Sequence, residues 1–200
     1  MCGIVAGSSL GLNIDNINQA IAILANRGPD WKNLWTNEHN FIGHTLLSLF
    51  SASVDKAIQP IYSYTKNLVG CVNGEVYNYP ALREKLEKIG CNFYTNSDAE
   101  VLINGIDQFG TKFLNEINGE FAFVVFNILE KEWIAGVDRF GTKPLKYYLD
   151  HNKFFIASNA NTLQELGINL TLDVDSCLHS LALQVLDKNR TIYKLSLIHI

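Results

Sequence analysis

Cysteine at position 2 is the residue of this chain with the most evident chemistry. It directly follows the initiator methionine, and methionine is removed efficiently when the next residue is small, so the mature chain is expected to begin at Cys2. A thiol with a pKa of about 8.5 is mostly protonated at neutral pH, and an α-amine with a pKa of about 7.7–8.0 can accept its proton. Cys2 would then carry a nucleophile and its base on one residue.

A structural interpretation of Cys2 stays open beside the catalytic one. Free cysteine behaves as a small hydrophobic residue, so Cys2 can equally be the start of a buried strand. The mass of the mature N-terminus separates the two interpretations, because a retained Met1 would block the amine.

The composition describes an ordinary globular protein with a sizeable core, at 200 residues, 48% hydrophobic and 18% charged. A net charge of -4 without a basic block argues against nucleic-acid and anionic membrane partners. No secretory signal or bilayer-spanning apolar run is visible. The 4 cysteines are widely spaced and form no CxxC pair, so we expect neither a zinc site nor a disulfide framework, and a cytoplasmic location.

Hydrophobic periodicity predicts a protein of many strands with helices inserted between strand groups. The run Phe121–Phe126 is apolar at every position, so this strand must be covered on both faces. A two-sheet sandwich with helices outside meets that demand. Strands are expected over residues 2–7, 31–35, 40–50, 61–64, 68–73, 91–94, 121–126, 133–137, 146–149, 153–157 and 192–198, and helices over about 15–26, 79–90, 97–109, 162–166 and 175–186.

Several short motifs have a purely structural interpretation beside a functional one. Arg27-Gly28-Pro29-Asp30 can be a plain loop, and Asn73-Gly74 a tight turn. A lone His44 in an apolar strand is more often a satisfied core group than a ligand. Asp98 follows a candidate N-cap serine, so it can simply be a favourable charge in a first helical turn.

The order of the motifs along the chain resembles the order found in a known family. It is similar to the class II glutamine amidotransferase domain of asparagine synthetases, an N-terminal-nucleophile hydrolase. The matching motifs occur in register over about 190 residues and are Met1-Cys2-Gly3-Ile4, Arg27-Gly28-Pro29-Asp30, Gly43-His44, Asn73-Gly74-Glu75-Val76-Tyr77-Asn78, Ser97-Asp98-Ala99-Glu100, Gly119-Glu120-Phe121-Ala122-Phe123 and Asp138-Arg139-Phe140-Gly141-Thr142-Lys143-Pro144-Leu145. The resemblance implies an α+β fold, a four-layer αββα sandwich of two antiparallel sheets.

The resemblance also implies roles for individual residues. Cys2 would attack the side-chain amide of glutamine, with its own amine as base. Asn73 and Gly74 match the family's oxyanion-hole donors, which acyl transfer needs at the developing oxygen charge. Glu75 and Asp98 match acidic residues that hold the ammonium group of glutamine, a sensible charge pairing.

One departure from the family pattern concerns the glutamine carboxylate. The family usually has an arginine as its carboxylate clamp where this chain has Leu46. Three interpretations stay open: another cation replaces it, with Arg27 the nearest candidate; glutamine binds weakly and free ammonia is the nitrogen source; or the site prefers no amino acid. The following residues, Leu47, Ser48 and Leu49, match positions that line the glutamine pocket.

The resemblance places the amidotransferase domain in residues 1–187 and a linker or strand towards a synthetase domain in residues 188–200. The resemblance implies that this second domain, expected to be missing from these residues, would hold ATP and Mg, so no cofactor and no metal is expected in the amidotransferase domain. The expected partners are glutamine and the synthetase domain, and a homodimer is one arrangement left open.

Three functions follow. The first is a glutaminase that supplies ammonia to an asparagine-synthetase-like domain. The second, motivated by Leu46, is a non-hydrolytic domain of an amide-forming enzyme such as a macrolactam or β-lactam synthetase. The third is a stand-alone amidohydrolase acting on another amide.

Overall fold

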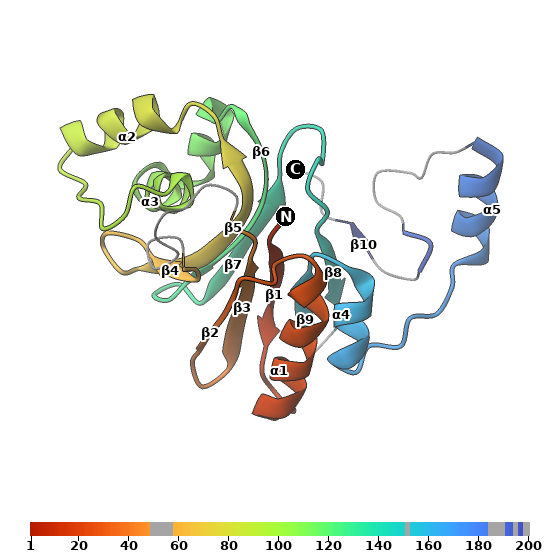
Figure 1. The fold of residues 1–200 in the computed structure, drawn as a ribbon. Coiled ribbons are helices and arrows are strands. Elements are labelled where there is room, and N and C mark those ends of the chain that lie inside the picture. The colour runs from red at the N-terminus through yellow and green to blue at the C-terminus, as the bar shows by residue number, and fades with distance from the viewer. Residues whose placement is uncertain (49–57, 151–152, 184–190, 194–195, 198–200) are drawn as a thin grey trace.

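The computed structural model describes residues 1–48, 58–150, 153–183, 191–193 and 196–197, and its strands form two antiparallel sheets (Figure 1). Sheet A has the strand order β10-β8-β9-β1-β3-β2, and sheet B has the order β4-β5-β6-β7. The strands of sheet A are β1 (Gly3–Ser8), β2 (Trp31–Thr36), β3 (Asn40–Leu46), β8 (Lys146–Leu149), β9 (Phe154–Ala157) and β10 (Ser196–Leu197). Those of sheet B are β4 (Ile61–Tyr62), β5 (Leu68–Val76), β6 (Gly119–Asn127) and β7 (Glu132–Val137).

Helices cover the outer face of each sheet, which completes four layers. Sheet A is covered by α1 (Ile14–Ile23), which runs into a 3-10 turn at Leu24–Asn26, and by α4 (Ala160–Glu165). Sheet B is covered by α2 (Tyr79–Lys88), α3 (Asp98–Phe109) and the 3-10 helix Gly110–Glu116. A further helix, α5 (Val174–Leu183), stands apart from both sheets (Figure 1). The expected αββα sandwich is confirmed.

Side-chain alternation along the strands builds the layer between the sheets. In β1, Ile4 and Ala6 face sheet B, whereas Val5 packs against the helices that cover sheet A. In β6, Phe121, Phe123 and Val125 belong to the helix-covered side, and the alternate residues Ala122, Val124 and Phe126 belong to the inter-sheet side. The strand at residues 121–126 is therefore buried on both faces, as its composition predicts.

Two strand registers determine which side chains meet at the site. In sheet A, Gly3 lies opposite Thr45 and Ile4 opposite His44. In sheet B, Glu75 on β5 lies opposite Glu120 on β6. Figure 1 shows the N-terminus between the two sheets. The start of β1 therefore lies between the end of β3 and the end of β5.

Several predicted strands differ from the structure. The strand expected at 40–50 ends at Leu46 and the one expected at 61–64 ends at Tyr62. Residues 91–94 form no strand: the Cys91 N–H donates to the Leu86 carbonyl at the end of α2, and the Tyr94 N–H donates to the Glu100 carboxylate. These two N–H groups are therefore not available for hydrogen bonds to a neighbouring strand. Of the predicted strand 192–198 the structure describes residues 192, 193, 196 and 197: Ser196 and Leu197 form β10 beside β8, and Tyr193 forms an isolated bridge with Leu172.

None of the helices in the described part of the chain is long and apolar enough to cross a membrane.

Candidate active site

Cys2 lies immediately before β1, and the strand register places it beside Leu46. Gly3 pairs with Thr45, so one further residue along both strands sets Cys2 opposite Leu46, with both side chains towards sheet B. The Leu47 N–H donates a hydrogen bond to the Cys2 sulfur. The thiol is free and half-buried, and by this register it faces the space between the sheets.

Burial raises the pKa of the Cys2 thiol, and the nearby Glu75 carboxylate raises it further. The Leu47 N–H, the Met1 amine and the Arg27 guanidinium act in the opposite direction without cancelling the effect of burial. The thiol is therefore protonated at neutral pH and needs a base to become a nucleophile. In the chain described here Met1 precedes Cys2, so the Cys2 nitrogen is part of a peptide bond.

The side chain of Asn73 faces the same space as the thiol. Cys71, Asn73 and Glu75 alternate on one face of β5, and the electrostatic influence of Cys2 reaches both Cys71 and Glu75. Asn73 lies between those two residues, only 1% exposed, and its Nδ2 atom has no hydrogen-bond partner. A buried unpaired donor is rare and needs an explanation. An oxyanion that forms only during reaction would supply the missing partner.

Gly74 has a backbone conformation that other residues adopt only with strain. Its φ is 146°, and a Cβ atom built there would lie 2.0 Å from the Glu120 carbonyl oxygen. β5 continues through Asn73 and Gly74 to Val76, so the tight-turn interpretation of this pair is wrong. Glycine instead allows β6 to approach closely beside the candidate oxyanion donors.

Two carboxylates lie at the end of β5. The Asp98 carboxylate accepts the Val76 N–H at 2.7 Å and the Ala99 N–H at 2.9 Å, which joins the start of α3 to this strand. Burial raises the pKa of Asp98 in spite of these hydrogen bonds. Burial also raises the pKa of Glu75, and the neighbouring Asp98 and Glu120 carboxylates raise it further. Asp98 therefore has its structural role in the first helical turn and also lies within electrostatic reach of Glu75.

The Arg27–Asp30 segment is more than a connecting loop. The Arg27 Nε–H donates to the Cys2 carbonyl oxygen at 3.1 Å. The Asp30 N–H donates to the Leu46 carbonyl at 3.0 Å, and the Asp30 carboxylate accepts the Ser48 N–H at 2.7 Å. One tetrapeptide thus fixes the nucleophile's backbone and the segment that follows β3.

The remaining predicted pocket residues lie at the end of β3 and directly after it. Leu46 is 5% exposed and faces sheet B, and Leu47 and Ser48 are half-buried. Leu49 lies outside the described residues. Leu46 thus occupies the position beside the thiol with an apolar side chain.

His44 is a core residue in the structure. Burial lowers its pKa to about 4, and it makes a backbone hydrogen bond with Val72 on β5, while its Nε2 atom has no partner. The ring is therefore neutral at physiological pH. The His44 bond to Val72 therefore joins sheet A to sheet B, and the Gln59 side chain, just before β4, bonds the N–H and the carbonyl of the same Val72.

Sequence reasoning assigned no role to the pair Glu120 and Lys143. Lys143 Nζ lies 3.2 Å from Glu120 Oε1, and the lysine side chain is only 13% exposed. Asp138 braces the loop that carries Lys143 by accepting the Phe121, Phe140 and Thr142 N–H groups. Both residues stand inside motifs that the sequence singled out, but only the fold shows that they meet.

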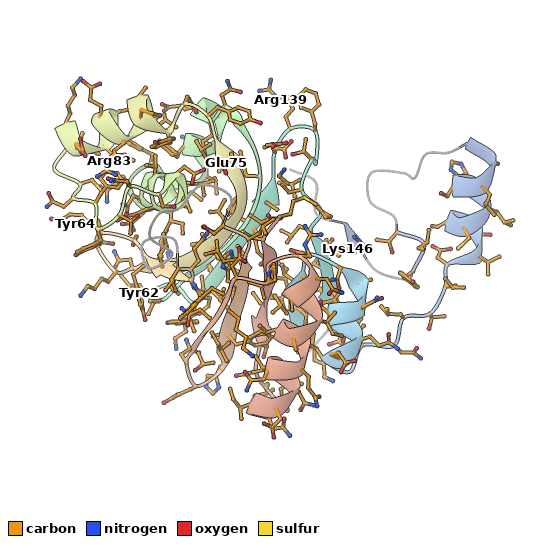
Figure 2. The ribbon with its side chains drawn as sticks, viewed as in Figure 1. Tyr62, Tyr64, Glu75, Arg83, Arg139 and Lys146 are labelled. Carbon is orange, nitrogen blue, oxygen red and sulfur yellow. The ribbon has the colours of Figure 1, made fainter. Side chains whose placement is uncertain are left out.

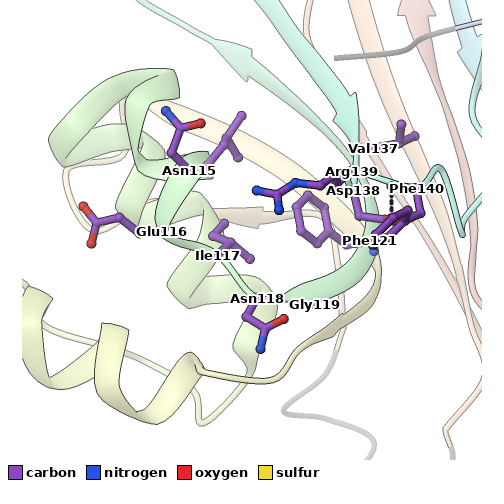
Figure 3. Close-up of a pocket in the computed structure, with 11 residues that line it drawn as sticks. Asn115, Glu116, Ile117, Asn118, Gly119, Phe121, Val137, Asp138, Arg139 and Phe140 are labelled. Atoms are coloured by element: carbon purple, nitrogen blue, oxygen red, sulfur yellow. Dashed lines mark hydrogen bonds between the residues drawn. The ribbon is translucent and has the colours of Figure 1, made fainter.

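A large cavity lies on the other side of sheet B. It measures about 480 Å³ and is lined by residues 114–119, Phe121, Val137, Asp138, Arg139 and Phe140. Figure 3 shows the Arg139 side chain extending across it. Phe121 points into the helix-covered side of sheet B, and neither Cys2 nor Asn73 lines this cavity. It is therefore distinct from the space that the thiol faces.

In the part of the chain that the structure describes, no group of three or more His, Cys, Asp and Glu side chains is arranged to hold a metal ion.

A thiol at the start of a strand in a four-layer sandwich, facing an amide donor on the second sheet, defines the class of N-terminal-nucleophile amidohydrolases. The profile of the glutamine amidotransferase domain matches residues 1–197. The chain therefore belongs to the glutamine amidotransferase domain family, and the predicted membership and N-terminal cysteine enzyme class are confirmed.

Curated relatives agree with this family. The chain is 31% identical to amidase chry2 of Gibberella zeae over 84% of its length and 24% of that protein's. It is 32% identical to the glutamine-hydrolysing asparagine synthetase B of Escherichia coli, over 70% of this chain and 25% of that one. It is 37% identical to asparagine synthetase 2 of Arabidopsis thaliana, over 72% and 25%. The chain thus spans about a quarter of the length of these relatives.

A solved structure shows the same fold. The glutamine phosphoribosylpyrophosphate amidotransferase of B. subtilis, complexed with ADP and GMP, aligns with a TM-score of 0.67 at 21% identity, over 83% of this chain and 44% of that one.

Proposed function

We propose that this domain hydrolyses the side-chain amide of glutamine to glutamate and ammonia, with the thiol of an N-terminal Cys2 as nucleophile. The observation that carries the proposal is the Asn73 amide, buried, unpaired and facing the same space as the thiol. A buried donor without a partner costs about 1–3 kcal/mol, which is tolerable where it stabilises a transition state.

The proposed steps follow from the groups in the site. The Cys2 amine takes the thiol proton, the sulfur bonds to the amide carbon, and Asn73 Nδ2–H with the Gly74 N–H stabilises the oxyanion. The amine returns the proton to the leaving nitrogen, so ammonia departs and a thioester remains. Water then breaks the carbon–sulfur bond and releases the acid. Arg27 holds the Cys2 backbone, and Glu75 and Asp98 attract the substrate ammonium group.

We further propose that the ammonia serves an ATP-dependent amidation in a synthetase domain of the asparagine-synthetase kind. The relatives named asparagine synthetase, each about four times as long as the matched region, support this arrangement. The proposed division at residues 187 and 188 falls outside the described residues. ATP and Mg would be held by that other domain. The four free cysteines support a reducing, cytoplasmic setting.

The test is glutamate release by the protein processed to begin at Cys2, compared with its Cys2→Ala variant. The proposal requires release by the first protein and none above background by the second. Equal rates would end it.

Leu46 favours a second candidate, a non-hydrolytic domain of an amide-forming enzyme, because an apolar side chain stands beside the thiol. This candidate requires that calorimetry of the unmutated protein with glutamine shows no heat, and that Leu46→Arg does not restore hydrolysis. Measurable glutamine binding argues against it. The relative named as an amidase keeps the third candidate, hydrolysis of another amide, within the same chemistry.

A further inference from the structure

Three carboxylates gather at the mouth of the proposed site. Glu75 and Glu120 lie directly opposite each other on β5 and β6, on the face turned towards sheet A. Asp98, bonded to the neighbouring Val76 N–H, lies close enough to act on Glu75. Like charges in direct opposition are unfavourable unless a cation joins them.

The cation that acts on Glu75, among the residues that the structure describes, is Lys143. Its Nζ atom is already paired with Glu120 at 3.2 Å, and its side chain is 13% exposed. The three carboxylates and this one lysine leave about two negative charges, by formal count. The mouth therefore favours a cationic group on a ligand.

Two other cations, Arg27 and Lys146, act electrostatically on each other, and of these two Arg27 acts on the thiol. Arg27 donates its Nε–H to the Cys2 carbonyl oxygen. Lys146 pairs with Ala157, which pairs with Val5, a residue of the helix-covered side of sheet A. Residues directly opposite in a sheet share one face, so Lys146 starts on the side away from sheet B. Figure 2 shows Glu75 beside β5 and Lys146 beside β8.

Leu46 completes the arrangement. It lies across from Cys2 on the inter-sheet face and is 5% exposed. A ligand carboxylate set against this side chain would lose water without gaining a partner, and it would also face the carboxylates of β5 and β6.

We propose that the site selects primary carboxamides that carry an ammonium group but no carboxylate, and that glutamine is a poorer substrate than such an amide. The inference rests on the proposed function, since it names the substrate class of the same thiol. The reaction is unchanged: the Cys2 sulfur bonds to the amide carbon, ammonia leaves with the returned proton, and water hydrolyses the thioester.

The experiment compares L-glutamine with L-glutaminamide, in which a carboxamide replaces the α-carboxylate, using the protein processed to begin at Cys2. Product analysis identifies the α-amide of glutamate, which reports cleavage of the side-chain amide. We expect kcat/KM to be higher for L-glutaminamide by about tenfold or more, because like-charge contacts are costly in a partly dry site. An equal value, or a higher one for glutamine, overturns the inference.

Two variants locate the cause. Leu46→Arg supplies a cation beside the thiol and should lower the preference for L-glutaminamide by about tenfold, whereas Leu46→Met should leave it within a factor of about three. If Leu46→Arg does not fold, Glu120→Gln removes one carboxylate and releases Lys143, and it should lower the same preference. A preference unchanged in the charge-altering variants that fold overturns the inference.

Failure of the proposed function has a different signature. If neither amide is hydrolysed, the glutaminase proposal fails, and selectivity is read from protection of Cys2 against iodoacetamide, followed by the mass of the N-terminal peptide. Stronger protection by L-glutaminamide than by glutamine supports the inference, and equal or weaker protection contradicts it.

Discussion

The guanidinium of Arg27 donates its Nε–H to the carbonyl oxygen of Cys2 across 3.1 Å. This bond joins the end of the α1 segment to the residue that carries the thiol. Because Arg27 contacts the backbone of Cys2, we predict that it positions this residue.

Arg27→Ala should lower kcat by about 10- to 100-fold, because a misplacement of about 1 Å can cost that much. The KM for the amide substrate should change little. Steady-state kinetics on the processed protein measure both, with Lys32→Ala, an exposed lysine on β2, as the control. A large rise in KM with unchanged kcat would instead show that Arg27 binds the substrate.

Asn73→Ala should separate activity from stability. Loss of an oxyanion donor lowers kcat by about 10²–10³, whereas Nδ2 has no partner to lose in the folded protein. Removal of the unpaired donor relieves its desolvation cost while the shorter side chain leaves a small cavity, so the free energy of unfolding in urea should not fall by more than about 1 kcal/mol.

Asn104 is the matched control for this variant. It is also buried with an unpaired Nδ2, but its Oδ1 accepts the Tyr64 N–H at 2.7 Å. Asn104→Ala should lose about 1–3 kcal/mol of stability and keep kcat. An active Asn73→Ala protein would remove Asn73 from the mechanism.

Gly74→Ala should destabilise the fold and lower kcat together. The positive φ alone costs about 1–3 kcal/mol, and the added Cβ would meet the Glu120 carbonyl oxygen at 2.0 Å. Gly90 also has a positive φ, of 90°, but has open space around its missing Cβ. Gly90→Ala thus isolates the backbone cost, and chemical denaturation of both variants gives the difference. If Gly74→Ala and Gly90→Ala lose the same free energy of unfolding, the close approach of β6 to Gly74 does not contribute to the cost of the substitution.

The hydrophobic pattern of each strand is local, so it predicts the sandwich from the sequence. The motifs keep a fixed order along the chain, so they predict the candidate site residues. Phe121–Phe126 is apolar at every position, which requires cover on two faces, and the structure provides it. The strand expected at 91–94 fails because the Glu100 carboxylate captures the Tyr94 and Thr95 N–H groups. A side chain that competes for backbone donors leaves no periodic trace in sequence.

The parts of the site that sequence could not supply depend on register. Glu120 and Lys143 meet only because β6 and the loop after β7 are brought together, and Asp30 finds the Ser48 N–H only after β3 has folded. The consequence of Leu46 also needed the register, since its position opposite Cys2 follows from the β1–β3 pairing.

His44 predicts a pH dependence of stability. Burial lowers its pKa to about 4 in the folded protein, against about 6.5 when unfolded. The unfolded state therefore binds more protons between these values, so stability is lost as the pH falls from about 6.5 towards 4. This group contributes about 2 kcal/mol of that loss by pH 5.

His44→Gln keeps a side-chain N–H donor at this position but removes the group that titrates. Urea denaturation of both proteins at neutral pH and near pH 5 gives the measurement, and the variant should lose less stability on acidification than the unmutated chain. An identical loss in both would show that His44 titrates normally.

The most direct test of the central claim compares ammonia release from an amide substrate by two forms of the same chain, one beginning at Cys2 and one retaining Met1. Burial raises the pKa of the thiol, so the nucleophile depends on the free amine of Cys2 as its base. We predict release by the form that begins at Cys2 and none by the form that retains Met1. Equal release by both forms would contradict the account.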